Sequence, residues 1–219
     1  MIPMNAIANS GFPEALFKAL RQMDKEACCK RDGEPAGLNW YGAYFRPECR
    51  RPPTETSWTR RLAQLLPTYG FPTEREVGYP HNHRLKCDNV ITLLDGAKLW
   101  LENKGAWKDY WNKNGGMWIY RSYLLHPLVP ELDRTKTHTV PLDLEKLYHL
   151  RRPAADHIGF LLLGFDSAAD PMDDDVAQLV GLAGLDKSPW TQASAGWKDR
   201  YRPGCRVLVW LWHRPVRAR

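Results

Sequence analysis

The chain has 219 residues, a formal net charge of +6 at pH 7 and a hydrophobic fraction of 43%. That length fits one domain with decoration, or at most two small domains, and the hydrophobic fraction allows a sizeable buried core. The sequence contains no apolar run of about 18 residues, which predicts no membrane span, and residues 1–6 do not resemble a signal peptide. Five cysteines, an odd number, do not suggest a disulfide framework. We therefore expect a cytoplasmic protein without a membrane partner.

The basic excess, with a pI near 9.1, is compatible with nucleic acid as a partner, although many basic proteins bind none. Ten tryptophans are unusual for this length. We expect most of them in the core or lining a groove, and a minority to be available for stacking on bases.

Residues 13–31 form the first predicted helix, because Leu16, Leu20 and Met23 recur at helical spacing and Pro13 suits a first turn. Residues 33–53 are rich in glycine, proline and aromatic side chains followed by arginines. They are compatible either with nucleic-acid binding or with a packed irregular loop. We interpret residues 1–53 as an accessory helix and loop that pack on a core domain spanning residues 54–219.

Residues 54–66 form the second predicted helix, with Thr54 as a plausible N-cap. Its exposed side carries Arg60 and Arg61, which are candidates for phosphate contacts. Glu55 falls in the first turn, where the helix dipole favours a carboxylate. The expected buried stripe consists of Trp58, Leu62, Leu65 and Leu66.

The first core strand is expected at residues 74–79, with Glu76 facing solvent or Arg75. His81, His83 and Cys87 follow and could be considered as zinc ligands. A fourth ligand at a familiar spacing is missing, so we do not expect zinc there.

Residues 86–104 predict a β-hairpin around Asp95-Gly96. Because side chains alternate along a strand, Glu102 and Lys104 should share one face with Trp100. Leu99 and Leu101 should point the other way, into a core.

The length of the hairpin loop decides where Asp88 lies. A two-residue loop, Asp95-Gly96, would pair Asp88 with Asn103 on the opposite face. A three-residue loop that starts at Leu94 places Gly96 where a left-handed residue is needed, and it puts Asp88 across from Glu102. Their Cβ atoms would then lie roughly 5 Å apart, which suits two carboxylates that hold one divalent cation. We favour the three-residue register.

Asp88 and the later Glu102-Asn103-Lys104 resemble the PD-(D/E)xK motif of the restriction-endonuclease-like nuclease superfamily. The resemblance implies an α/β core in which a mixed central sheet is flanked by helices. It also implies Mg²⁺, for which Mn²⁺ can substitute, held by Asp88 and Glu102. The lysine would assist the attacking water and stabilise charge on the phosphate. One departure is Cys87, which stands where the motif has proline.

Two further metal-site residues are candidates. Many members carry a glutamate on the helix before the hairpin, and Glu55 matches that position. The backbone carbonyl of Asn103 lies between the two catalytic side chains and is a candidate further ligand.

The segment after the hairpin, residues 105–123, alternates aromatic and basic side chains. In the implied fold it would lie at the rim of a substrate cleft, although an aromatic cluster covering a small core would look similar. Its candidate nucleic-acid-binding residues are Trp107, Lys108, Lys113 and Arg121.

The remaining elements complete the expected sheet. Residues 141–150 and 170–185 predict helices, and residues 206–213 predict a last strand. Residues 156–165 contain a continuous apolar run, which indicates a central strand covered on both faces. We interpret the acidic run of residues 173–175 as carboxylates that answer a helix dipole.

These elements predict an α/β protein with a mixed sheet between helical layers and an N-terminal helical decoration. With the resemblance, they favour a metal-dependent nuclease that acts on DNA rather than RNA. One alternative is a nucleic-acid-binding module on the same fold that does not cleave. Another is a partner-binding protein whose hairpin carries an ordinary ion pair. A homodimer or larger complex stays open.

Overall fold

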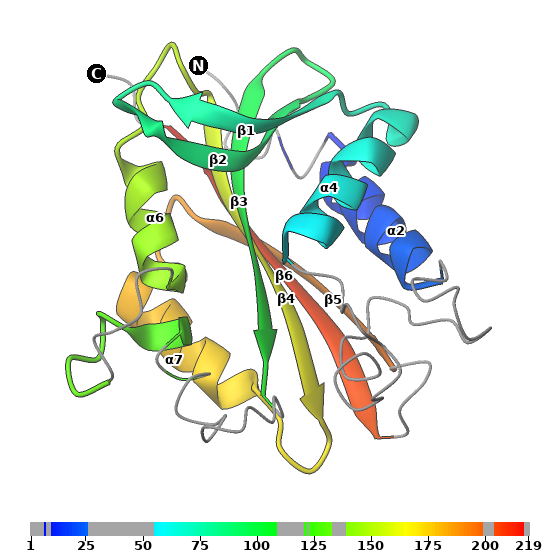
Figure 1. The fold of residues 1–219 in the computed structure, drawn as a ribbon, viewed down its shortest axis with the longest axis vertical. Coiled ribbons are helices and arrows are strands. Elements are labelled where there is room, and N and C mark those ends of the chain that lie inside the picture. Colours follow the sequence, from blue (N-terminus) through cyan, green and yellow to red (C-terminus); the bar gives the residue numbers. More distant parts are fainter. Residues whose placement is uncertain are drawn as a thin grey trace.

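The computed structural model describes residues 7, 10–25, 55–108, 121, 123–132, 139–198 and 204–216 (Figure 1). The described part is an α/β structure in which helices flank a mixed six-stranded sheet. Its helices are α2 (Phe12–Lys25), α4 (Glu55–Leu65), the short 3₁₀ helix η1 (Leu66–Tyr69), α6 (Val140–Tyr148) and α7 (Asp173–Ala183). Its strands are β1 (Thr73–Tyr79), β2 (Asn82–Thr92), β3 (Lys98–Trp107), β4 (His157–Ser167), β5 (Thr191–Lys198) and β6 (Cys205–Pro215).

The strand order in the sheet is β1-β2-β3-β4-β6-β5. Strands β1, β2 and β3 form an antiparallel meander, and β3 then pairs in parallel with β4 after a crossover that contains α6. The other two neighbouring pairs, β4 with β6 and β6 with β5, are antiparallel. The sheet is therefore mixed, as the sequence predicts.

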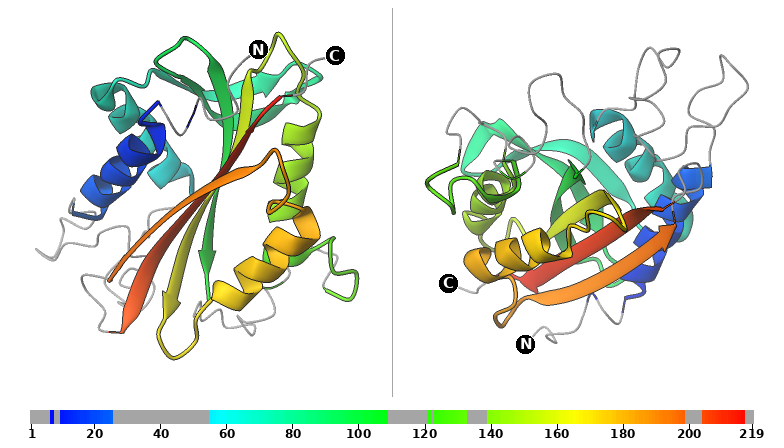
Figure 2. Two further views of the ribbon diagram at one scale, coloured as in Figure 1. Left: turned by 180° about the vertical axis from the view of Figure 1, so that it is seen from behind. Right: turned by 90° about the horizontal axis from the view of Figure 1, so that it is seen from below.

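Two hydrophobic cores lie on opposite faces of the sheet. Helices α2 and α4 cover one face, and α6 and α7 cover the other (Figures 1 and 2). Along β3, Leu99 and Leu101 enter the core under α2 and α4, whereas Trp100 and Ala106 enter the core under α6 and α7. This alternation follows from the two-residue period of a strand.

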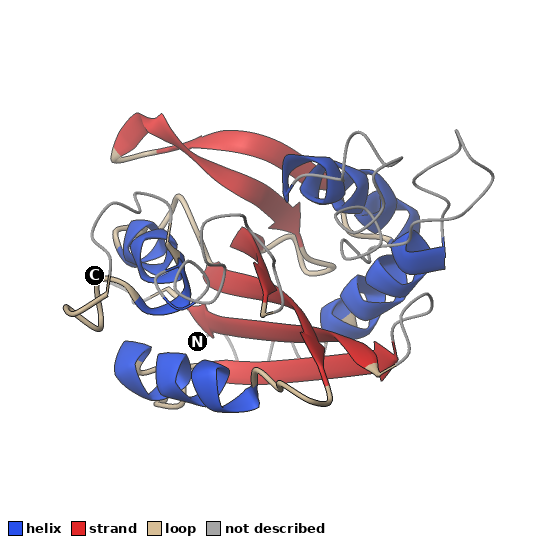
Figure 3. Ribbon diagram, turned by 60° about the horizontal axis from the view of Figure 1, so that its bottom comes forward, coloured by secondary structure: helices blue, strands red, loops and turns tan. Residues whose placement is uncertain are grey.

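Strand β4 is buried along almost its whole length, because β3 and β6 flank it and helices cover both its faces (Figure 3). The predicted central strand is confirmed. At Gly164 the packing is so close that an added Cβ would lie 2.5 Å from Met172 Sδ and 2.6 Å from a ring carbon of Trp210. Only glycine fits there without movement of its neighbours.

Strand β5 is absent from the sequence prediction. Its residues are mostly small, and they alternate between half-buried and exposed along the edge of the sheet beside β6. Small residues have weak strand propensity. The strand therefore depends on backbone pairing with β6, which composition does not reveal.

Where they lie within the described residues, the other predicted helices and strands occur, with small shifts at their ends. Residues 26–54, which include the end of the first predicted helix, the segment 33–53 and Thr54, lie outside the described residues. Helix α2 contributes Phe12, Leu16 and Leu20 to the same core as Trp58 and Leu62 of α4, so it packs on the sheet domain. The expected buried stripe of α4 is confirmed. None of the described helices is both long and apolar enough to cross a lipid bilayer.

Candidate active site

The β2–β3 hairpin adopts the three-residue register. The backbone N–H of Leu93 donates to the carbonyl of Ala97 at 2.9 Å, and Gly96 has a positive φ of 83°. The ladder then pairs Ile91 with Leu99 and continues as far as Asn89 with Leu101. Regular pairing stops there, one residue short of Asp88 and Glu102. The three-residue turn predicted from Gly96 is confirmed, whereas the placement of Asp88 directly across from Glu102 stays a prediction.

Asp88 uses its side chain where the regular ladder ends. Its Oδ2 accepts a hydrogen bond of 2.9 Å from the backbone N–H of Asn103. This bond ties the acid of β2 to the residue between Glu102 and Lys104. The Asn103 side chain is fully buried, and its amide atoms have no hydrogen-bond partner among the described residues.

Glu102 and Lys104 lie on the face of β3 that α6 covers, and both are nearly buried, at 2% and 8% exposure. Glu102 Oε1 accepts a hydrogen bond of 2.5 Å from the hydroxyl of Tyr79, the last residue of β1. Burial raises the pKa of Tyr79 far above its usual value, and the neighbouring Cys87 and Glu102 raise it further. Tyr79 therefore stays a neutral donor that holds the Glu102 carboxylate.

The pKa of Glu102 is raised well above its usual value. Burial is the largest cause, followed by repulsion from Asp88 and then from Asp143. Lys146 and the hydrogen bond from Tyr79 act in the opposite direction. The carboxylates of Asp88, Glu102 and Asp143 therefore lie near one another in a poorly solvated place. This arrangement opposes ionisation of Glu102 unless a positive charge is supplied.

Helix α6 supplies two side chains that the sequence analysis missed. Asp143 Oδ2 lies 2.9 Å from Lys104 Nζ, and Asp143 Oδ1 pairs with Lys146. The Lys104 ammonium also lies 6.0 Å from the ring centroid of Tyr123. The signal that could have indicated this pair is the i,i+3 spacing of Asp143 and Lys146 on the crossover helix.

The donor set fits a hard divalent cation. Asp88 and Glu102 offer carboxylate oxygens, which Mg²⁺ and Mn²⁺ prefer, and Mg²⁺ commonly binds through one or two carboxylates while it keeps several waters. Among the described residues, no group of three or more histidine, cysteine or acidic side chains is arranged as a ready-made metal site. A cation here would therefore depend on two carboxylates together with water or substrate oxygens.

Cys87 and His81, two of the residues considered as zinc ligands, have other contacts in the structure. The Cys87 thiol is buried, donates to the carbonyl oxygens of Asn89 and Leu101, and has its pKa raised mainly by burial. His81 is exposed and lies near the rings of Tyr79 and His149.

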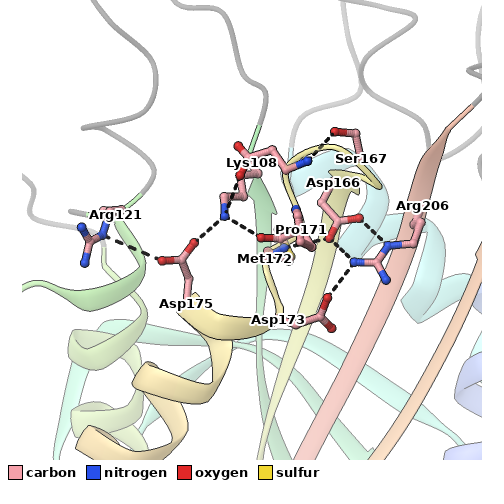
Figure 4. Close-up of polar contacts among 10 residues, drawn as sticks. Lys108, Arg121, Asp166, Ser167, Pro171, Met172, Asp173, Asp175 and Arg206 are labelled. Carbon is pink, nitrogen blue, oxygen red and sulfur yellow. Dashed lines mark hydrogen bonds and ion pairs between the residues drawn. The ribbon is translucent and has the colours of Figure 1, made fainter.

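Two predicted phosphate-binding cations are held by acids at the start of α7 (Figure 4). Lys108 Nζ lies 2.9 Å from Asp170 and 3.0 Å from Asp175, and Arg121 Nε lies 3.9 Å from Asp175. Burial alone would lower the pKa of Lys108, but hydrogen bonds and attraction from the two carboxylates raise it. Both cations thus have carboxylate partners within the protein, and their contact with nucleic acid stays a prediction.

The same region contains an ion pair between a buried acid and a partly exposed arginine at the end of the sheet. Asp166 is fully buried and accepts two hydrogen bonds from Arg206 of β6 and one of 2.9 Å from the backbone N–H of Met172 (Figure 4). Arg206 also pairs with Asp173. The acidic start of α7 therefore has ion-pair partners as well as the helix dipole that the sequence analysis assigned to it.

Of the other predicted residues, some have described side chains and some lie outside the described residues. Arg60 of α4 is exposed, and Arg61 is half-buried and donates to Gln64 at 3.3 Å. Glu76 is exposed and pairs with Arg75, as expected. The side chains of Glu55 and Trp107, and the whole of Lys113, lie outside the described residues.

In comparisons with known proteins, no family model, no curated protein sequence and no solved structure matches this chain.

Proposed function

We propose that the chain is a metal-dependent nuclease of the PD-(D/E)xK type that hydrolyses phosphodiester bonds, with DNA as the favoured substrate. The observation that carries this proposal is the three-residue hairpin register, whose pairing ends one step before Asp88 and Glu102. There the Asp88 side chain accepts a hydrogen bond from the backbone N–H of Asn103, the residue between Glu102 and Lys104. Asp88 and Glu102 supply the two carboxylates that the motif requires, and Lys104 supplies its lysine.

The arrangement of the elements supports the proposal. Helix α4 precedes the meander β1-β2-β3, and the crossover through α6 leads to the parallel strand β4. The acidic hairpin therefore lies next to the central strand of a mixed sheet between helices. This is where a restriction-endonuclease-like core would carry its site.

In the proposed mechanism, Asp88, Glu102 and the backbone carbonyl of Asn103 hold Mg²⁺ or Mn²⁺. When bound, the cation neutralises charge on the phosphate and acidifies a water molecule. Tyr79 orients the Glu102 carboxylate through its hydroxyl. The hydrogen bond between Asp88 and the backbone of Asn103 keeps both acids beside the same stretch of β3.

Lys104 enters this mechanism as a cation. Its ion pair with the buried carboxylate of Asp143 stabilises the ammonium form. An ammonium group next to the two acids can orient the attacking water and balance the charge that develops on the phosphate. Deprotonation of the water by Lys104, the other role that the motif allows, would first require the loss of this ion pair.

The proposal is tested by incubating the protein with supercoiled, linear and single-stranded DNA and with RNA, with and without Mg²⁺ or Mn²⁺. We expect cleavage of DNA that EDTA abolishes and that Glu102→Gln removes. Asp186→Asn is the matched control, because Asp186 is an exposed acid beyond α7. No cleavage of any substrate with either metal would contradict the proposal.

A binding module without cleavage is the second candidate. It is favoured by the ion pairs that already compensate Asp143 and by the lack of a third described acid arranged with Asp88 and Glu102 around a metal. Calorimetry separates the two candidates. The nuclease should bind Mn²⁺ and lose that binding in Asp88→Asn, whereas the binding module should retain DNA affinity without metal binding.

A further inference from the structure

We propose that Lys146 of α6 is a second phosphate-contacting cation of this site, held beside Lys104 by the shared carboxylate of Asp143. In this arrangement Asp143 is a positioning residue and Lys146 touches the substrate. The inference rests on the proposed nuclease function and adds to it residues that lie outside the D…ExK motif.

The geometry is the first argument. One carboxylate, with its side chain 2% exposed, pairs through Oδ2 with Lys104 and through Oδ1 with Lys146. Lys104 comes from β3 and Lys146 from α6, so a single buried group joins two ammonium groups from different elements. A carboxylate that pairs with both fixes the separation between them.

The exposure of the two lysines is the second argument. The Lys104 side chain is 10% exposed, whereas that of Lys146 is 24% exposed. Lys146 is thus the lysine of the pair with more access to an incoming phosphate. Lys146 and Glu102 also attract each other: the lysine lowers the pKa of Glu102, and Glu102 raises the pKa of Lys146.

Charge balance is the third argument. With all groups in their formal charge states, Asp88, Glu102 and Asp143 carry one more negative charge than Lys104 and Lys146 carry positive charges. A divalent cation turns this deficit into a single positive charge, which a phosphodiester, with its single negative charge, would neutralise. Without Lys146 the loaded site would be neutral before the substrate arrived, and the phosphate would leave an uncompensated negative charge in a poorly solvated place.

An ordinary helix ion pair would look different. Asp143 and Lys146 have the i,i+3 spacing of surface pairs, but such pairs are solvated and stabilise a helix only slightly. Here the acid is buried and already has Lys104 as a partner. A second buried contact is therefore more than helix stability requires.

The test compares Lys146→Met and Lys146→Arg with Lys187→Met, a control that removes an exposed lysine beyond α7. Binding of a fluorescent DNA duplex is measured in Ca²⁺ at several salt concentrations. Each lost phosphate contact should make the slope of log K against log salt shallower by about 0.9. We expect this change in Lys146→Met, recovery in Lys146→Arg and no change in Lys187→Met.

Cleavage and metal binding complete the test. Lys146→Met should cut the cleavage rate by about tenfold or more, while Mn²⁺ binding by calorimetry persists. Asp143→Asn should lower kcat while Mn²⁺ affinity is kept, and Asp143→Glu should restore part of the rate. Thermal melting identifies a variant that fails to fold, and Lys146→Gln then takes the place of Lys146→Met.

The outcomes separate this inference from the proposed function. If the wild-type protein cleaves DNA but Lys146→Met matches Lys187→Met in both cleavage rate and salt slope, the inference about Lys146 is overturned and the nuclease stands. If the wild-type protein cleaves nothing with either metal, the proposed function is overturned, and this inference falls with it.

Discussion

The side chain of Asp88 accepts a hydrogen bond from the backbone N–H of Asn103, at 2.9 Å between donor and acceptor. This bond crosses from β2 to β3 and joins the first acid of the motif to the middle of the Glu-x-Lys segment. The acid thus replaces a ladder hydrogen bond at the point where regular pairing ends, and one of its oxygens is fixed beside Glu102.

This relationship predicts the effect of removing the acid. Asp88→Ala should lose metal affinity together with cleavage, because one of two carboxylate ligands is gone. We expect at least about a tenfold loss of Mn²⁺ affinity by calorimetry. Asp186→Asn serves as the control and should bind like the wild type. Unchanged Mn²⁺ affinity in Asp88→Ala would place the metal elsewhere.

Tyr79→Phe tests the hydrogen bond to Glu102. Because that bond lowers the pKa of Glu102, its loss should raise this pKa further, so metal-dependent cleavage should require a higher pH. The acid limb of the pH–rate profile should therefore move to higher pH, and unfolding should become easier by about 1–3 kcal/mol. Tyr69→Phe, which removes an exposed hydroxyl bonded to Gln22, is the control. An acid limb at the same pH in both variants would remove Tyr79 from the site.

Two buried histidines predict a loss of stability in acid. Burial, together with the neighbouring His157, lowers the pKa of His213 to about 4, whereas the unfolded chain should titrate near 6.5. Because the unfolded state binds the proton more readily, this contribution is present above about pH 6.5 and is lost as the pH falls toward 4.

Urea unfolding measures this loss. Between pH 7 and pH 5 the free energy of unfolding should fall by about 2 kcal/mol through His213 alone. His213→Gln should show a flatter pH dependence over the same range. An equal dependence in the wild-type protein and the variant would show that other groups cause the acid loss.

The sequence predicts much of the fold and of the motif, because both depend on local patterns. Gly96 indicates the left-handed turn residue, and that turn sets the register of the hairpin as far as Asn89 and Leu101. The apolar run of β4 indicates a strand covered on both faces. In each case the signal lies within one element or one tight turn.

Contacts between distant elements could not be predicted in this way. Asp143 reaches Lys104 because of the angle at which α6 packs on β3, which helical periodicity does not encode. Asp170 and Asp175, at the start of α7, pair with Lys108 from a distant part of the sequence. The basic character of residues 105–123 therefore overstates their free positive charge. The edge strand β5 depends on pairing with β6 and carries no apolar pattern of its own.

Close packing at Gly164 predicts that adding even one methyl group at this position lowers the stability of the protein. Gly164→Ala would push a methyl group against Met172 and Trp210, and it should destabilise the protein by about 1–3 kcal/mol in urea unfolding. Gly181→Ala is the matched control, because no neighbouring group of the described residues lies within 4 Å of its added Cβ in helix α7. That control should gain about 0.5–1 kcal/mol. Equal stabilities in the two variants would contradict the packing described for β4.

The most direct test of the central claim is the rate of Mg²⁺-dependent cleavage of supercoiled DNA by Lys104→Ala and the wild-type protein, with Mn²⁺ binding measured on both. We expect the variant to bind Mn²⁺ and DNA but to lose roughly 10²-fold or more in cleavage rate, because the cation beside Glu102 and Asp143 is gone. If Lys104 only pairs with an acid in the fold, the change should alter stability and leave the cleavage rate per folded molecule unchanged. Near-wild-type, metal-dependent cleavage by Lys104→Ala would contradict the proposed role of the lysine, and the same result in Asp88→Ala would place the active site elsewhere.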